Sequence, residues 1–256
     1  MNLATNRFKA RLKSGEQQIG IWNTIPDPCV VEALAGAGFD WLLIDTEHTA
    51  VEVSAVLPLL QAAAPHGSAC VVRPVENNVA LIKRHLDQGA QTILLPQIQS
   101  RAEAEAAVSA ALYPPAGIRG VAGNMRAANY GRIRDYTIAA NDEICVLLQI
   151  ESAQGLDHLE EIAATPGVDG IFIGPSDLAA SLGYPGRSGH PEVRTTVLRA
   201  ISRLKDLGVP SGLLTLERSF AEDCMAAGST FTAIGLDMHL LVGAVDRLAT
   251  DFGRAT

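Results

Sequence analysis

Short apolar segments recur along the chain at intervals that fit alternating strands and helices. Most of them are rich in Val, Ile and Leu and lack the apolar and polar alternation of a half-exposed strand. Strands that helices bury on both faces have this composition, which favours a parallel sheet. Eight strands are predicted, at residues 19–22, 41–44, 69–72, 92–95, 145–150, 170–173, 211–214 and 231–236.

The segments between these strands have the spacing of amphipathic helices. Residues 30–38, 52–64, 79–89 and 101–112 are the clearest, and several end in glycine, which helix C-termini prefer. Eight strands that alternate with helices fit a closed (β/α)₈ barrel better than an open doubly wound sheet. The stretch WNTIPDPC after the first strand also lacks the glycine pattern of a dinucleotide-binding turn.

The domain organisation follows from where the alternation of predicted strands and helices is interrupted. No linker or low-complexity stretch divides the chain, so one barrel domain spanning residues 1–256 is predicted. Residues 113–143 are the irregular part. They are too long for an ordinary loop, and we expect a structured insertion over one face of the barrel.

Composition and charge narrow the possible partners. Hydrophobic residues make up 48% of the 256 residues and charged residues 19%, which is enough apolar material for a large core. The net charge of −8 disfavours a general affinity for nucleic acid or anionic membranes, so small molecules are the expected partners.

The cysteines and the apolar runs bear on the compartment. The four cysteines are widely spaced and form no C-x-x-C pair, so we expect reduced thiols in a cytoplasmic protein. The N-terminus has no apolar stretch behind its basic residues, and no uncharged apolar run reaches the roughly 18 residues of a membrane span. Secretion and membrane insertion are therefore not expected.

Polar side chains gather just after the predicted strands, where a barrel carries its catalytic face. At least four strands contribute to this set, so their polar groups should converge on one mouth. The residues are Asp45, Glu47 and His48 after the second strand, Arg73 after the third, Pro96 and Gln97 after the fourth, Gln149 and Glu151 on the fifth, and Gly174, Pro175, Ser176 and Asp177 after the sixth.

Glu151 and Asp177 are candidate metal ligands. Two carboxylates without a competing Cys or acidic cluster suit an octahedral ion such as Mg²⁺ or Mn²⁺, which keeps positions for water and substrate. Taken singly, Asp177 fits equally well as a helix N-terminal acid, and Glu151 as a solvated loop charge. As a pair on adjacent strand ends, they favour metal ligation.

Arg73 and His48 each allow two interpretations. Arg73 follows four apolar residues, so it needs either an acidic partner, Asp45 or Glu47, or a substrate oxyanion. His48 is either a hydrogen-bonded strand-end imidazole or a general base held by Asp45 in the correct tautomer. The other histidines, His66, His85, His158, His190 and His239, are assigned surface or capping roles.

Six ordered motifs resemble the HpcH/HpaI family of class II pyruvate aldolases over essentially the whole chain. They are AGAGFDWLLIDTEH, VVRP, TILLPQ, YPPAGIRG, LLQIES and VDGIFIGPSDLAASLGYPG. The likeness extends to aldolases for 4-hydroxy-2-oxoheptane-1,7-dioate and for 2-keto-3-deoxy sugar acids. It implies a barrel of the phosphoenolpyruvate/pyruvate-binding type and a role in aromatic catabolism.

The resemblance also implies roles for individual residues. Glu151 and Asp177 correspond to ligands of Mg²⁺, Mn²⁺ or Co²⁺, Arg73 to the arginine facing the pyruvyl oxygens, and His48 with Asp45 to the acid/base pair. Further residues correspond to supporting groups: Gln149 and the backbone amides of Ser176 and Asp177 for the substrate carboxylate, Glu47 for a water beside the metal, and Leu216 for the pocket wall.

Assembly is implied as well. Family members are commonly hexamers whose last helix packs against a neighbour. In this chain that helix would span residues 238–252, and Asp87 would be contributed to the adjacent subunit's site. Thr46 departs from the motif, in which the position before the glutamate is often glycine or apolar, and this could alter pocket polarity.

The implied activity is the reversible cleavage of 4-hydroxy-2-oxo acids to pyruvate and an aldehyde. Two alternatives remain: a CoA-ester lyase of the malyl or citramalyl type, and a non-catalytic barrel that binds a keto acid. A Schiff-base mechanism needs a lysine inside the barrel. The lysines, Lys9, Lys13, Lys83 and Lys205, all lie in terminal or helical segments, which argues against it.

Overall fold

The computed structural model describes residues 3–254 and contains a closed barrel of eight parallel strands, so the predicted fold class is confirmed. The predicted domain extends two residues further at each end, outside the described residues. Each strand pairs with its neighbours in sequence order, and the last pairs with the first. The strands are β1 (Gln18–Asn23), β2 (Trp41–Asp45), β3 (Ala69–Arg73), β4 (Thr92–Leu95), β5 (Cys145–Ile150), β6 (Gly170–Ile173), β7 (Ser211–Leu214) and β8 (Phe231–Leu236).

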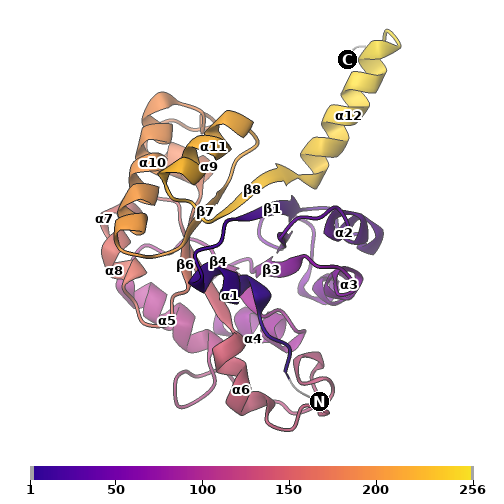
Figure 1. Ribbon diagram of the computed structural model, residues 1–256, viewed down its shortest axis with the longest axis vertical. Helices are drawn as coiled ribbons and strands as arrows, with labels where there is room; N and C mark the ends of the chain where they lie inside the picture. The colour runs from indigo at the N-terminus through magenta and orange to yellow at the C-terminus, as the bar shows by residue number, and fades with distance from the viewer. Residues whose placement is uncertain (1–2, 255–256) are drawn as a thin grey trace.

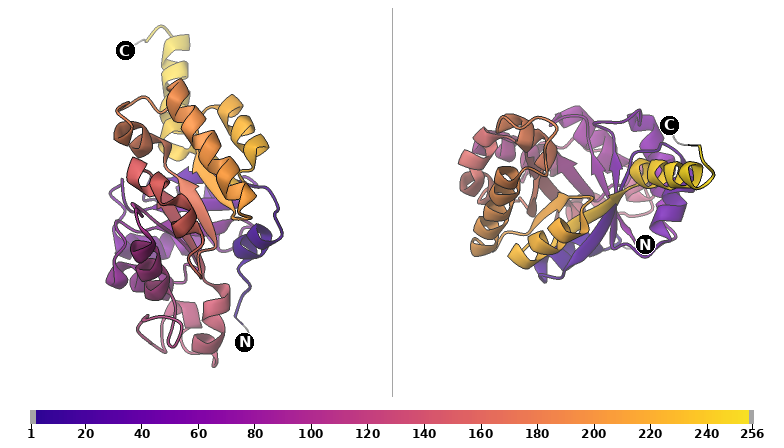
Figure 2. Two further views of the ribbon diagram at one scale, coloured as in Figure 1. Left: turned by 90° about the vertical axis from the view of Figure 1, so that its left-hand side faces the viewer. Right: turned by 90° about the horizontal axis from the view of Figure 1, so that it is seen from above.

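Most of the helices surround the barrel and cover the outer face of its strands, whereas α12 projects away from it (Figures 1 and 2). They are α1 (Arg7–Lys13), α2 (Pro28–Ala35), α3 (Val53–Ala63), α4 (Val79–Asp87), α5 (Arg101–Ala111), α6 (Tyr136–Glu143), α7 (Ala153–Asp157), α8 (Leu159–Ala163), α9 (Pro175–Ser181), α10 (Pro191–Asp206), α11 (Arg218–Ala227) and α12 (Asp237–Asp251). Most strands are therefore buried on both faces, which explains their unbroken apolar sequences, whereas Ile234 on β8 is exposed. None of the described helices is both long and apolar enough to span a membrane.

Aromatic side chains fill the barrel interior below the catalytic end. Phe8, on the unpredicted helix α1, packs edge-on against Trp41 and Phe231 at centroid distances of 5.8 and 5.7 Å. Gly20 on β1 makes room for this cluster, because a β-carbon there would lie 2.1 Å from the Trp41 ring. The buried pair Phe8 and Leu12, four residues apart, was the sequence signal for α1.

The insertion at residues 113–143 is structured, as expected, and includes a 3₁₀ turn (Arg126–Ala128) and α6. It lies at the amino-terminal end of the barrel, opposite the strand ends that carry the candidate site (Figure 1). Asn6 donates to the Glu143 carbonyl at 2.9 Å, and Arg126 donates to the Gln88 carbonyl at 2.7 Å. The insertion therefore does not line the site of its own chain.

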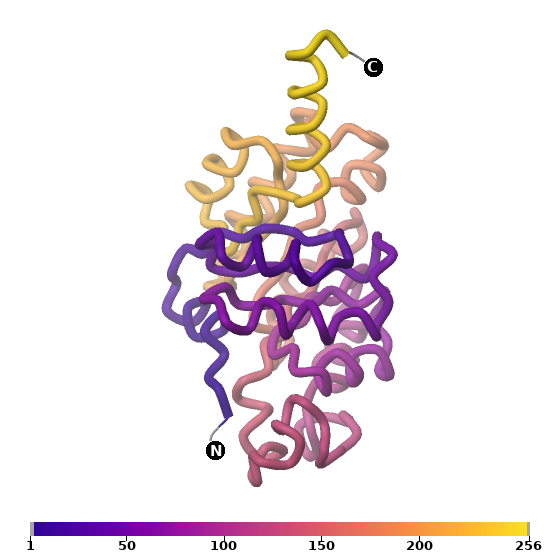
Figure 3. Tube along the Cα trace, turned by 90° about the vertical axis from the view of Figure 1, so that its right-hand side faces the viewer, coloured from indigo at the N-terminus to yellow at the C-terminus, as the bar shows by residue number. Residues whose placement is uncertain are grey.

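Helix α12 projects from the barrel (Figures 1 and 3), close to the predicted range of 238–252. Among the described residues of this helix, only Asp237, at its first position, is buried. The carboxylate of Asp237 accepts hydrogen bonds from the Asn23 amide at 2.7 Å and from the backbone N–H groups of Thr24 and Ile25, both at 2.9 Å. The base of α12 is thus fixed to the loop that follows β1.

The assignment of His85 to a surface or capping role is wrong. Its side chain is on the buried face of α4 with Ile82 and Leu86, and neither ring nitrogen has a hydrogen-bond partner among the described residues. Burial lowers the pKa of His85 to about 4. By contrast, His190 does cap a helix, since its ring nitrogen accepts from the Glu192 N–H.

His85 should make the fold sensitive to acid. Its folded pKa lies below the value of about 6.5 expected in the unfolded chain, so its neutral form contributes stability that is present above pH 6.5 and declines as the pH falls toward 4. In His85→Leu, the free energy of unfolding should fall by about 2 kcal/mol less between pH 7 and pH 5 than in the wild type. Urea unfolding at both pH values measures this, and an identical pH dependence would contradict it.

Candidate active site

The ends of β2 and β3 bring Asp45 and Arg73 together, because these residues are register partners in the sheet. The Arg73 Nε donates to Asp45 Oδ1 at 2.9 Å, and Nη2 donates to Oδ2 at 2.7 Å. Both side chains are buried. Burial alone raises the pKa of Asp45, but the hydrogen bonds and charge of Arg73 outweigh it, and the net shift is downward. Asp45 is therefore an anion locked to Arg73.

The expected contact between Asp45 and His48 is not formed. Both carboxylate oxygens of Asp45 are occupied by Arg73, and the His48 side chain is 61% exposed. The His48 Nε2 lies 3.7 Å from Glu47 Oε2 instead. The acidic neighbour of the imidazole is thus Glu47, because the chain turns outward after β2 and carries His48 away from the buried pair.

Glu47 is a second acidic partner of Arg73. Its Oε2 lies 2.9 Å from Arg73 Nη1, and its side chain is buried. Burial raises the pKa of Glu47 to about 7, although the charges of Arg73 and His48 oppose the rise. Both acidic partners expected for Arg73 are therefore present, and Glu47 links the arginine to the imidazole.

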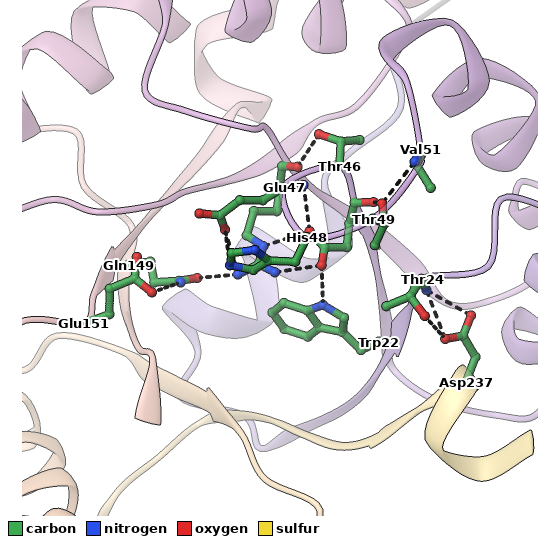
Figure 4. Close-up of polar contacts among 12 residues, drawn as sticks. Trp22, Thr24, Thr46, Glu47, His48, Thr49, Val51, Gln149, Glu151 and Asp237 are labelled. Carbon is green, nitrogen blue, oxygen red and sulfur yellow. Dashed lines mark hydrogen bonds and ion pairs between the residues drawn. The ribbon is translucent and has the colours of Figure 1, made fainter. Parts of the chain in front are cut away.

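Gln149 and Glu151 lie next to this group at the end of β5. The Arg73 Nη1 lies 3.5 Å from Gln149 Oε1, and Gln149 Nε2 donates to Glu151 Oε2 at 2.5 Å (Figure 4). The other oxygen of Glu151 accepts the Gln97 backbone N–H at 2.8 Å, and Gln97 has a left-handed φ of 57°. Such backbone is costly outside glycine and gathers at functional sites. These bonds hold Glu151 in a fixed orientation.

The carboxylates of Glu151 and Asp177 fit a divalent ion. Asp177 is exposed on the first turn of α9. The pKa of Glu151 is raised mainly by the burial of Glu151 itself, and the negative charge of Asp177 adds to this rise. A cation between the two would relieve this unfavourable pairing. No cluster of three or more His, Cys, Asp or Glu side chains suited to a metal occurs within residues 3–254. Two carboxylates match an ion that takes its other oxygens from water and substrate.

The remaining predicted residues lie in two places. Ser176 and Leu216 line one cavity of about 300 Å³ beside the ends of β6 to β8. Asp87, at the end of α4, lies at the amino-terminal end of the barrel, where it pairs with Arg119 at 2.8 Å. Asp87 is therefore separated from the other candidate residues of its own chain, which is compatible with a role in a neighbouring subunit.

Two residues at the site were given no role from the sequence. Trp22, at the end of β1, donates its indole N–H to Asp45 Oδ2 at 3.2 Å. Gly174, after β6, lies against Glu151. The signal for Trp22 was an aromatic residue with a polar atom at the catalytic end of an otherwise aliphatic strand, and Gly174 directly preceded the candidate ligands.

Gly174 should be required for the position of Glu151. A β-carbon at Gly174 would lie 2.8 Å from Glu151 Cβ and 2.9 Å from Oε2, so Gly174→Ala must displace the carboxylate. We expect Mn²⁺ affinity, measured by calorimetry, to fall by about 10–100-fold, the range for losing support of a ligand. The control is Gly67→Ala, where a β-carbon meets no atom within 4 Å. Unchanged affinity in a folded Gly174→Ala protein would exclude Glu151 as a ligand.

Comparisons with known proteins identify the family of the chain. A family model described as HpcH/HpaI aldolase/citrate lyase matches residues 18–244.

A pyruvate aldolase of Rhizobium etli is 51% identical over 252 residues, covering 98% of this chain and 99% of that protein. A 4-hydroxy-2-oxo-heptane-1,7-dioate aldolase of Shigella sonnei is 47% identical over 249 residues, covering 97% and 95%. The crystal structure of a family protein from Burkholderia cenocepacia J2315 matches with a TM-score of 0.93 at 40% identity, covering 98% of this chain and 100% of that one. These matches confirm the resemblance found in the sequence, and the chain belongs to the HpcH/HpaI aldolase/citrate lyase family.

Proposed function

We propose that this chain is a divalent-metal-dependent aldolase that cleaves 4-hydroxy-2-oxo acids to pyruvate and an aldehyde. Its family relatives include a pyruvate aldolase and a 4-hydroxy-2-oxo-heptane-1,7-dioate aldolase. The observation that supports the proposal most directly is the contact of Arg73 with Gln149, and of Gln149 with the candidate metal ligand Glu151. A guanidinium and a metal site side by side suit a substrate with adjacent keto and carboxylate oxygens.

Each side chain has a distinct task in this reaction. Glu151 and Asp177 would hold the ion, which when bound polarises the keto group of the substrate. Arg73 binds the keto oxygen and stabilises the charge that develops there as the C3–C4 bond breaks and pyruvate leaves as its enolate. Gln149, with the backbone amides of Ser176 and Asp177, orients the carboxylate. Leu216 lies at the wall that receives the rest of the substrate.

His48 is assigned as the base that removes the proton of the 4-hydroxyl group. The imidazole is exposed at the mouth, where it can reach a substrate hydroxyl, and Glu47 is its acidic neighbour. Asp45 acts through Arg73 instead, by holding the guanidinium in place. A positioned base of this kind accelerates a reaction by about 10²–10⁴-fold.

A lysine-dependent mechanism does not fit the structure. Lys9 and Lys13 lie on α1, Lys83 on α4 and Lys205 on α10. None of them follows a strand at the catalytic end of the barrel, so no amine is placed to form a Schiff base with a bound keto acid.

The proposed activity is tested with pyruvate, a panel of aldehydes and Mg²⁺, Mn²⁺ or Co²⁺, with the products identified by mass. We expect aldol adducts that disappear in excess chelator and return when metal is restored. Glu151→Gln should bind metal poorly and lose activity. Full activity in chelator would overturn the metal-dependent assignment, and activity confined to malyl- or citramalyl-CoA would favour the thioester lyase.

His48 should be needed for aldol cleavage but not for forming the enolate. Decarboxylation of oxaloacetate passes through the same pyruvate enolate without removal of a hydroxyl proton. His48→Ala should therefore lose aldol cleavage by about 10²–10⁴-fold while metal-dependent decarboxylation falls far less. Both rates are measured on one preparation at saturating metal. Equal losses would assign the proton to another group.

We further propose that the chain forms a homo-oligomer through α12, with a hexamer as the family expectation. Apolar residues on this helix and at its C-cap are spaced by alternating steps of three and four, and all are 44–77% exposed: Met238, Leu241, Val245, Leu248 and Phe252. This spacing forms one continuous stripe along a helix. A stripe without a partner among residues 3–254 of its own chain is the surface that a second copy would cover.

Charge on this stripe should weaken assembly. Val245→Lys places an ammonium in the apolar seam, where it would be desolvated on association, and should shift the protein to a smaller species in sedimentation velocity. Asp246→Lys adds the same side chain one position away, outside the stripe, and serves as the control. An unchanged sedimentation coefficient in Val245→Lys would place the subunit contact elsewhere.

A further inference from the structure

Trp22 touches both members of the buried ion pair at the catalytic mouth. Its indole N–H donates to Asp45 Oδ2 at 3.2 Å (Figure 4). The Arg73 guanidinium carbon lies 5.0 Å from the centre of the Trp22 ring, within the range of a cation–π contact. Trp22 is itself only 3% exposed, so these contacts are made away from bulk water.

The hydrogen bond from Trp22 completes the set of donors around Asp45. Oδ1 accepts from Arg73 Nε and from the Glu47 backbone N–H, and Oδ2 accepts from Arg73 Nη2 and from Trp22. Each oxygen thus has two donors. A carboxylate held at four points cannot rotate, so it fixes the plane of the guanidinium fork that it binds. The remaining nitrogen of that fork, Nη1, then lies 2.9 Å from Glu47 Oε2 and 3.5 Å from Gln149 Oε1.

The indole is held in turn by the aromatic core. Its ring centre lies 6.5 Å from Trp41 on β2 and 5.5 Å from Phe172 on β6, on different sides of the barrel. Because interiors of this kind are closely packed, the indole has one available orientation. Rigid support behind a binding group is what keeps catalytic geometry within tolerance.

We propose that Trp22 is a positioning residue that sets the orientation of Arg73, through its hydrogen bond to Asp45 and through the face of its ring. The proposal rests on the proposed function, in which Arg73 stabilises the developing enolate oxygen. It links the aromatic interior of the barrel to the electrostatics of the catalytic mouth. A small tilt of the indole would move the guanidinium away from the oxygen it must meet.

The test replaces each tryptophan by phenylalanine. Trp22→Phe keeps an aromatic ring and removes the donor to Asp45. We expect kcat for aldol cleavage to fall by about tenfold to a hundredfold, as for a lost hydrogen bond to a charged group, with a smaller change in KM. Oxaloacetate decarboxylation should fall by the same factor, because both reactions need Arg73. Trp22→Leu, which also removes the ring face, should lose more.

Trp41→Phe is the matched control. Trp41 belongs to the same buried cluster and also donates its indole N–H, to the Gln18 carbonyl at 3.4 Å, but it contacts neither Asp45 nor Arg73 in the described chain. Phenylalanine keeps an aromatic ring beside Trp22 and removes no donor to Asp45, so the kcat of Trp41→Phe should fall by less than that of Trp22→Phe. Equal losses in the two variants, or an unchanged Trp22→Phe, would overturn the proposal.

A second measurement does not depend on activity. The chain has two tryptophans, so Trp41→Phe leaves Trp22 as the sole tryptophan and Trp22→Phe leaves Trp41, and each is excited selectively above the absorption of tyrosine. Adding Arg73→Lys should change the emission of Trp22 and leave that of Trp41 unaltered, because only Trp22 faces the guanidinium. Absence of any change at Trp22 would show that the contact is not formed. If the wild type had no aldolase activity but this response were present, the proposed function would fail while the contact between Trp22 and Arg73 stood.

Discussion

The ion pair of Asp45 and Arg73 is the contact around which the catalytic mouth is arranged. Taking two charges out of water is costly, and the cost is met only when their geometry and remaining hydrogen bonds are nearly complete. Here the parallel register of β2 and β3 places the two residues opposite each other, and further donors come from Trp22 and the Glu47 backbone. The ion pair therefore depends on the strand arrangement of the barrel. The positions of the polar side chains at the strand ends depend in turn on the ion pair.

The barrel interior is divided between packing and chemistry. Toward the amino-terminal end, Phe8, Trp41 and Phe231 fill the space with apolar rings, whereas charged and amide groups occupy the ends of β2, β3 and β5. Trp22 lies at the boundary, with its ring in the aromatic cluster and its N–H at the site. A rigid apolar base beneath a polar mouth keeps donor and acceptor positions fixed, which is the preorganisation that the proposed reaction would require.

The chain presents two surfaces that point away from its own site. Helix α12 extends from one end of the barrel, and the insertion lies at the opposite end (Figures 1 and 3). The helix carries an exposed apolar stripe, and Arg119 of the insertion pairs with Asp87 of α4. Asp237 fixes the base of α12 to the loop after β1, two residues from Trp22. These hydrogen bonds therefore connect the first turn of α12 to the end of β1, the strand that carries Trp22.

The sequence determined the fold because its signals are local and repeated. Eight unalternated apolar strands with helices between them admit few architectures, and their bounds differ from the structure by at most one residue at either end. Strand ends also identified Asp45, Arg73, Gln149 and Glu151 as neighbours at one mouth, because parallel strands bring their carboxyl ends together.

Contacts across the barrel were decided only by the tertiary structure. Sequence proximity suggested that Asp45 would hold His48, but the register gave Asp45 to Arg73, 28 residues away, and left the imidazole to Glu47. His85 and Trp22 looked unremarkable in sequence, because burial and cross-strand contacts depend on which helix face or strand lies opposite. The periodicity of apolar residues along one segment determines whether that segment forms a helix or a strand. The hydrogen-bond partner of each polar atom is determined by segments that are distant in the sequence.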